Sequence, residues 1–425
     1  MLKTVAANGK DEFDFINGIK LRAGDVGSEI DAAVSEIMWA VKTRGYAAVE
    51  EYSLRFDKAP PREISIREAE DAYGRCSPEL IRAMERASAN IRSYQEKLLT
   101  VSGEWGGGGA AVGCIVRGIQ RLGIYVPGGT AAYPSSVLMT AVPAKVAGVE
   151  EIIMVTPPTD FLSDEVLAAA KIAGVDRIIA CGGAHAVAAL TYGAGFIPQV
   201  DKLVGPGNAY VASAKRMAYG TVDIDMVAGP SEILIIADGT AEPEYVAADL
   251  LSQAEHDRLA SCILITDCAA LADEVKKQVG IQLEKLPRRD IAAGALESFG
   301  GIIICGDLRT ACELGNVCAP EHLEIMTENP RELLPQIRNA GAVFLGKYTP
   351  EPLGDYMAGP SHVLPTSGTA RFFSPLSVDS FLKKMSVIEY SREALAEVSD
   401  DIVSMAKKER LDAHANSISV RRIKG

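Results

Sequence analysis

The sequence lacks the signals that mark secreted, membrane and redox proteins. No stretch approaches the roughly 18 apolar residues of a membrane span, and Met1–Phe15 has no apolar region of the kind found in a secretory signal. We therefore expect a cytoplasmic protein with no membrane partner. The eight cysteines include no Cys-x-x-Cys pair, which argues against a zinc ribbon or a dithiol redox motif and favours buried, reduced thiols.

Positive charge is also scarce, and the formal net charge of −13 disfavours nucleic acid and anionic membranes as partners. The two dense basic clusters, Lys285–Arg289 and Arg421–Lys424, are interpreted as solvated faces. The chain contains no low-complexity tract and no short-period repeat. Its 425 residues, 48% of them hydrophobic, are typical of a globular protein with about two or three domains.

Short apolar runs alternate with helical segments from residue 122 onward, whereas residues 27–100 are predicted to be mostly helical. This alternation predicts two doubly wound, Rossmann-like α/β units with parallel sheets. The glycine run Gly106–Gly109 predicts a turn or mobile loop, and the tail from Ser377 predicts one strand and one helix. Buried strands are predicted at Leu122–Val126, Glu151–Val155, Arg177–Cys181, Lys202–Val204, Glu232–Ala237, Ser261–Thr266, Gly301–Cys305, His322–Met326 and Ala342–Leu345.

Three glycine-rich turns follow predicted strands, at Tyr125–Thr130, Gly205–Asn208 and Ala228–Glu232. None matches the dinucleotide fingerprint G-x-G-x-x-G. Each turn alone is either a tight turn or a turn that lets the backbone approach a phosphate or cofactor. Their clustering favours the second interpretation without identifying the ligand.

Four of the five histidines lie beside or near carboxylates in short tracts of the second half of the chain. Histidine titrates near neutral pH and binds metals, and a nearby carboxylate orients the ring or completes a metal shell. Four such pairings in a histidine-poor sequence suggest one assembled site. The tracts are Ser252–Asp257, Ala319–Glu324, Asp355–His362 and Asp412–His414.

Each tract also has a plainer interpretation. Gln253 and His256 share one stripe of a predicted helix, where they either bind a metal or form a polar surface. The pair Glu321-His322 opens a predicted strand and suits proton transfer and water activation, unless it is a surface acid beside a half-buried ring. By itself, His414 near the C-terminus indicates no function.

Together these tracts resemble the histidinol dehydrogenase family, from about residue 30 to Arg422. The motifs occur in the same order over nearly the whole chain, so the resemblance is specific. The stretches that carry it are Gly123–Gly129, Gly205–Val211, Ile224–Glu232, Ser252–His256, Ala319–Glu324, Gly359–Thr366, Arg371-Phe372, Ser377 and Asp412–His414.

The resemblance implies oxidation of L-histidinol to L-histidine with two NAD+, through a bound aldehyde, in the last steps of histidine biosynthesis. It implies His322 as the general base and Glu321 as the residue that activates water. It also implies one Zn2+ per subunit, which holds the substrate's imidazole and amino groups. The implied zinc ligands, which also bind substrate, are Gln253, His256, Asp355 and His414. Further implied substrate contacts are Ser231, His322, His362 and Glu409, and implied NAD contacts are Tyr125, His185 and Asn208.

The resemblance further implies an interlocked homodimer, in which Glu409 and His414 complete the partner subunit's site. His185 is a departure, because it stands where the family usually places a glutamine that contacts NAD. Two alternatives are a relative on the same scaffold that oxidises another polar alcohol, and a zinc hydrolase, which leaves the paired α/β units unexplained. The expected division is an N-terminal helical extension (1–20), a first Rossmann-like domain (21–124 and 233–376), a second (125–232) and a C-terminal tail (377–425).

Overall fold

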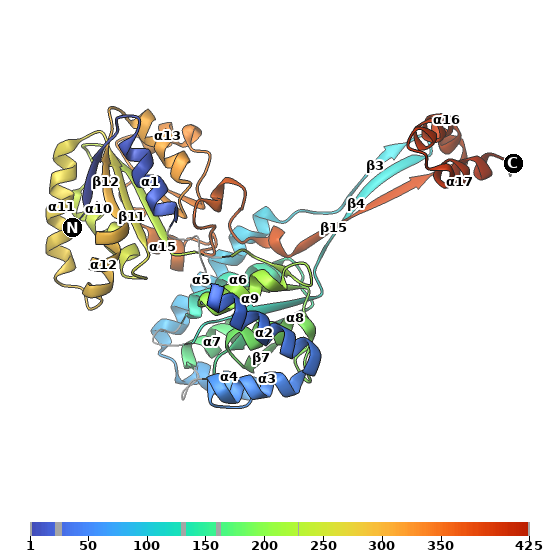
Figure 1. Ribbon diagram of the computed structural model, residues 1–425, viewed down its shortest axis with the longest axis horizontal. Helices are drawn as coiled ribbons and strands as arrows, with labels where there is room; N and C mark the ends of the chain where they lie inside the picture. The colour runs from blue at the N-terminus through green and yellow to red at the C-terminus, as the bar shows by residue number, and fades with distance from the viewer. Residues whose placement is uncertain (1, 22–27, 129–132, 159–162, 228, 424–425) are drawn as a thin grey trace.

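The computed structural model describes residues 2–21, 28–128, 133–158, 163–227 and 229–423 (Figure 1). Within these residues, two six-stranded sheets are each covered by helices on both faces, and a separate three-stranded sheet forms a projecting arm. The predicted class of two parallel α/β units is therefore confirmed. None of the helices described is long and apolar enough to cross a membrane.

The first sheet has the strand order β1-β12-β11-β10-β13-β14, and every neighbouring pair is parallel. Its two central strands are buried along their whole length, because helices pack on both faces. The strands are β1 (Lys3–Ala6), β10 (Glu232–Ala237), β11 (Ser261–Thr266), β12 (Gly300–Ile304), β13 (His322–Met326) and β14 (Ala342–Leu345). The helices that cover it are α1 (Asp11–Leu21) and α13 (Leu308–Cys318) on one face, and α10 (Pro243–Ala254), α11 (Ala269–Leu283) and α12 (Arg289–Phe299) on the other.

The second sheet has the order β2-β7-β6-β5-β8-β9 and is parallel except for β2, which runs antiparallel to β7. Its strands are β2 (Arg62–Ile64), β5 (Arg121–Tyr125), β6 (Glu151–Thr156), β7 (Arg177–Ala180), β8 (Lys202–Val204) and β9 (Asp223–Ile224). One face carries α2 (Ser28–Arg44), α3 (Tyr46–Tyr52), α8 (Gly183–Tyr192) and α9 (Ala209–Ala218). The other carries α4 (Ile66–Arg75), α5 (Pro78–Leu98), α6 (Pro134–Val146) and α7 (Asp164–Ala173).

The sheets divide the chain differently from the expected division. Residues 28–98 pack on the second sheet, whereas we expected residues 21–124 to belong with residues 233–376. The segment Lys3–Ala6, expected within a helical extension, is an edge strand of the first sheet. Strands as short as Lys3–Ala6 and Arg62–Ile64 cannot display a clear period of two, so pairing partners rather than local pattern decided their place.

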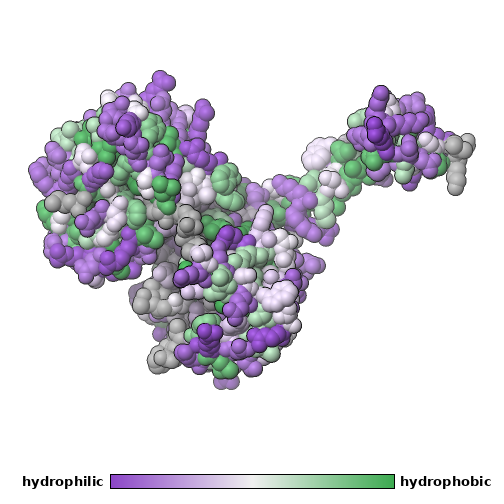
Figure 2. Space-filling model, in the orientation of Figure 1, coloured by the Kyte–Doolittle hydropathy of each residue, from purple (hydrophilic) through white to green (hydrophobic). Residues whose placement is uncertain are grey.

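The arm consists of the antiparallel strands β3 (Gly103–Gly107), β4 (Ala110–Gly118) and β15 (Leu382–Tyr390), and it ends in α16 (Arg392–Lys408) and α17 (Asp412–Ile423). The predicted turn is a hairpin at Gly108 and Gly109, and both have positive φ angles. The cross-strand neighbours Val112 and Ile388 are 49% and 73% exposed. Apolar surface therefore remains uncovered along the arm (Figure 2).

Candidate active site

A cavity of about 230 Å³ lies between the two α/β units. The first unit contributes residues at the amino ends of β10 and β13, and the second contributes the turn after β8 and the start of α6. Open α/β sheets usually bind ligands at the carboxyl ends of their strands. Only the second sheet follows that rule here. The expected site residues on the cavity wall are Ser231, Gln253, His256, Glu321, His322, Asp355 and His362.

Glu321 and His322 both bond to the backbone of Glu232. The Oε2 atom of Glu321 accepts a hydrogen bond from the Glu232 amide (2.9 Å), and Nδ1 of His322 lies 3.0 Å from the Glu232 carbonyl oxygen. Because a carbonyl can only accept, Nδ1 carries the hydrogen and Nε2 keeps its lone pair in the neutral ring. Among the described residues, Nε2 has no hydrogen-bond partner.

Burial sets the protonation of this pair. It lowers the pKa of His322 to about 4, so the imidazole is neutral at pH 7 and can accept a proton at Nε2. Burial also raises the pKa of Glu321 well above its ordinary value. A cation bound nearby would lower the pKa of this carboxyl and favour its ionised form. The arrangement therefore provides a proton acceptor and an acid whose charge depends on its surroundings.

A second group of buried acids was not among the expected site residues. One of them, Glu351, lines the cavity, and its Oε1 lies 3.8 Å from Nε2 of His322. The amide of Glu351, at the start of α15 (Glu351–Tyr356), donates to Oε1 of Glu324 (2.8 Å). Burial raises the pKa of Glu351 to about 9, of Asp249 to about 6, and of Glu324 well above its ordinary value. The sequence held one signal for this group: Glu324 is two residues after His322 on a strand and so faces the same side.

Several residues at the cavity could hold a metal ion. The ligand atoms of His322, Glu351 and Asp355 lie within 4.8 Å of one another. Gln253 is 0% exposed, and neither polar atom of its amide has a hydrogen-bond partner within the described part of the chain. Buried amides are almost always paired, so this orphaned group suits a ligand that the protein alone does not supply. With Asp355 and His256, it forms a nitrogen and oxygen donor set that fits zinc.

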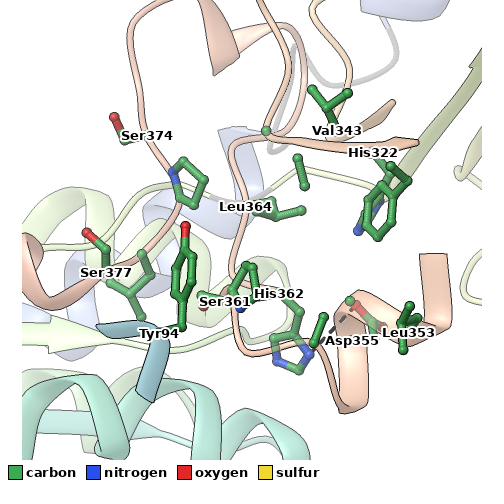
Figure 3. A pocket seen from close by; sticks show the side chains of 18 of the residues that line it. Tyr94, His322, Val343, Leu353, Asp355, Ser361, His362, Leu364, Ser374 and Ser377 are labelled. Carbon is green, nitrogen blue, oxygen red and sulfur yellow. Dashed lines mark ion pairs between the residues drawn. The ribbon is translucent and has the colours of Figure 1, made fainter. Parts of the chain in front are cut away.

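His362 and Asp355 face each other across the loop that follows α15, with Nδ1 and Oδ1 3.9 Å apart (Figure 3). Burial lowers the pKa of His362, which favours the neutral ring. An adjoining cavity of about 490 Å³ shares His322, Asp355 and His362 with the first. Its other walls include Val343 and Leu364, and Leu364 also lines the first cavity, so these titratable residues lie on the wall that the two cavities share.

The three residues expected to contact NAD lie in the second unit. Asn208 caps α9, where its Oδ1 accepts hydrogen bonds from the amides of Tyr210 and Val211. Tyr125, at the end of β5, is 3% exposed, and its hydroxyl accepts a hydrogen bond from the Gly183 amide (3.1 Å). His185 is 1% exposed and its ring points inward, with Nε2 3.0 Å from Oδ2 of Asp57. Gly129, Thr130 and Ala228 of the glycine turns lie outside the described residues.

Glu409 and His414 lie apart from the other expected site residues. His414 is in α17, which packs against α16 at the far end of the arm (Figure 1). Glu409 directly follows α16, and both side chains are exposed. Within one subunit, the structure therefore brings together every expected metal and substrate residue except these two.

Two parallel α/β units, with a proton acceptor and a candidate cation site in the cavity between them, define an oxidoreductase of two Rossmann-like domains. The chain belongs to the histidinol dehydrogenase family, whose family model matches residues 21–422.

Similar proteins support this assignment over the full length. The chain is 51% identical to a histidinol dehydrogenase of Clostridium acetobutylicum, with 99% of both chains covered. It is 52% identical to one from Heliobacterium mobile, with 93% of this chain and 94% of the relative covered. The crystal structure of histidinol dehydrogenase from Elizabethkingia anophelis matches with a TM-score of 0.93 and 36% identity, covering 99% of this chain and 98% of the other.

Proposed function

We propose that this enzyme oxidises L-histidinol to L-histidine through L-histidinaldehyde, with zinc and two NAD+, in the last steps of histidine biosynthesis. One observation carries the proposal. His322 is a neutral imidazole whose Nε2 has no hydrogen-bond partner among the described residues, and it lies beside a buried acid, Glu321. The same cavity wall holds the amide of Gln253, which is also unpaired within the described part of the chain. Membership of the family supplies the substrate class.

The alcohol step needs a base, because hydride can leave the carbinol carbon only as the hydroxyl loses its proton. Nε2 of His322 is the acceptor, since Nδ1 is held by the Glu232 carbonyl. Glu321 takes a proton from the water that adds to the aldehyde. His322, after it has released its first proton to solvent, takes the hydroxyl proton of the hydrated aldehyde in the second oxidation, as hydride passes to the second NAD+. Ser231 and His362, on the same cavity wall, contact the substrate.

Gln253, His256 and Asp355 would hold zinc together with His414 of the partner subunit. Bound there, zinc would supply an orienting template for the imidazole and amino groups of the substrate. Tyr125 and Asn208 would border the NAD+ site on the second unit.

We infer a homodimer with shared active sites. The arm supports this inference, because it exposes apolar side chains on a sheet and ends in the two residues that the cavity of its own subunit lacks. Glu409 and His414 would then reach the cavity of the partner, which would cover the exposed His256. An uncovered apolar arm is typical of a segment that is buried in an assembly.

The test follows NADH absorbance with purified protein, zinc, NAD+ and a limiting amount of L-histidinol. Two NADH per histidinol are expected, and chelation of zinc should abolish them until zinc is restored. If NADH forms only from another alcohol, that alcohol and not L-histidinol is the substrate. No NADH from any alcohol would refute the proposal.

A further inference from the structure

A buried polar cluster holds the glycine turn between β7 and α8. Its centre is Asp57, which ends a single π-helical turn, η1 (Ser53–Asp57), directly after α3. The Oδ2 atom of Asp57 accepts hydrogen bonds from the Gly182 amide (2.9 Å), Nε2 of His185 (3.0 Å) and Oγ of Ser53 (3.3 Å). The side chains of Asp57 and His185 are only 8% and 1% exposed. The carboxylate thus lies at the amino end of α8, where the helix dipole favours negative charge.

The ring of His185 packs directly under this turn. Because a carboxylate oxygen accepts hydrogen bonds, Nε2 of His185 carries a hydrogen directed at Oδ2 of Asp57, and the buried Nδ1 has no partner within the described part of the chain. A Cβ atom added to Gly183, whose φ is +59°, would lie 3.2 Å from Nδ1. The ring therefore packs against the turn and is itself buried.

The same turn also fixes the position of the Tyr125 hydroxyl. The Gly183 amide donates to the hydroxyl of Tyr125, and burial raises the pKa of that hydroxyl to about 12, so it remains a neutral phenol. The two amides of the turn are thus consumed by Asp57 and Tyr125 rather than left for a phosphate. None of these side chains lies on the wall of the 230 Å³ cavity, so the cluster has no direct route to the reacting atoms.

We infer that Asp57 and His185 are positioning residues for the cofactor: they hold the Gly182–Gly183 turn, and through it Tyr125, in the shape that NAD+ binds. The inference rests on the proposed function. Three residues, Ser53, Gly182 and His185, donate to one carboxylate oxygen of Asp57, so losing that oxygen releases the turn and the ring together. We therefore expect loss of the Asp57 carboxylate to weaken NAD+ binding without affecting proton transfer.

The test compares Asp57→Ala, Asp57→Asn and His185→Gln by steady-state kinetics. Asp57→Ala removes the acceptor of three hydrogen bonds and should raise KM for NAD+ about tenfold, while kcat and KM for histidinol change less than twofold. Asp57→Asn keeps an acceptor for the Gly182 amide, and His185→Gln keeps a donor to Asp57. Both should therefore remain within about threefold of the wild type, since each preserves one hydrogen bond of the cluster.

Glu12→Gln is the matched control, because Glu12 is a buried carboxylate that accepts backbone amides of Asn8, Gly9 and Lys10 in the other unit. It should leave KM for NAD+ unchanged even if it lowers stability. An Asp57→Ala enzyme with wild-type KM for NAD+, or with equal changes in both KM values and kcat, overturns the inference. If the wild type produces no NADH, the proposed function is refuted. If the wild type produces NADH but Asp57→Ala leaves KM for NAD+ unchanged, only the positioning role is refuted.

Discussion

Replacing His322 by asparagine or by glutamine tests the roles of its two ring nitrogen atoms, Nδ1 and Nε2, separately. Asparagine places an amide nitrogen near the position of Nδ1 and keeps the bond to the Glu232 carbonyl, but it removes Nε2. Glutamine reaches the position of Nε2 but leaves the buried Glu232 carbonyl without this donor. If Nε2 is the general base, His322→Asn should lower kcat by about 10² to 10⁴, the usual contribution of a positioned base.

The same pair of variants tests the structural bond. Both lose the packed ring, so the difference between them isolates the hydrogen bond to Glu232, and His322→Gln should be less stable by about 1–3 kcal/mol. The variants also change the pH dependence of stability. Since folding lowers the pKa of His322 from 6.5 to about 4, the unfolded chain takes up the proton first, and stability is lost as pH falls through this window. Between pH 6.5 and 5 that loss is about 2 kcal/mol in the wild type, and both variants lack it.

The assays are kcat from NADH absorbance and unfolding free energy from urea titrations at several pH values. Circular dichroism should confirm that both variants remain folded. A His322→Asn enzyme with kcat within tenfold of the wild type would refute the role of Nε2 as base. A variant His322→Gln that is more stable than His322→Asn would refute the assignment of the hydrogen to Nδ1.

Four further predictions concern other residues of the proposed site. Glu321→Gln should slow oxidation of added L-histidinaldehyde more than that of histidinol in single-turnover assays, and equal losses would contradict its role with water. Because burial raises the pKa of Glu321, the wild-type aldehyde step should slow as pH falls through that raised pKa, where the carboxylate takes up a proton. Gln253→Met should reduce the zinc bound per subunit. It should also stabilise the metal-free protein by about 1–3 kcal/mol, because it removes an amide that has no partner among the described residues. A metal-free variant that is less stable than the wild type would show that this amide is paired. Mixed dimers of His414→Ala and Glu321→Gln subunits should recover partial activity if sites are shared, and verified heterodimers without activity would exclude sharing.

Local pattern was sufficient to predict the central strands of both sheets. Runs such as Glu232–Ala237 and Ser261–Thr266 are wholly apolar apart from their ends, because helices cover both faces, and their observed bounds equal the predicted ones. The arm was predicted in part: the glycine turn and one strand and one helix of the tail are present as expected, whereas β3 and β4 were not predicted. Val112 lies on β4, where most residues are half-buried and only Val112 and Arg117 are exposed, so the strand shows no alternation of buried and exposed residues.

The candidate site shows the same division. The sequence alone predicted the pairing of Glu321 with His322 and the possible metal ligands Gln253 and His256. These residue types bind metals or transfer protons in any fold, so they could be recognised without the structure. Their place at the amino end of β13, facing the second unit, was not visible, because strand direction and sheet order depend on distant segments. The inward turn of His185 depended on Asp57, which is 128 residues away in the chain.

The sequence by itself determined the elements, the chemistry of the side chains and the family resemblance, because these follow from periodicity and residue type over short stretches. Only the tertiary structure decided which unit residues 28–98 join and which nitrogen of His322 is free. It also showed that Glu409 and His414 lie away from their own cavity. Those outcomes depend on pairing, burial and hydrogen bonds between segments far apart in the chain, and no local pattern records them.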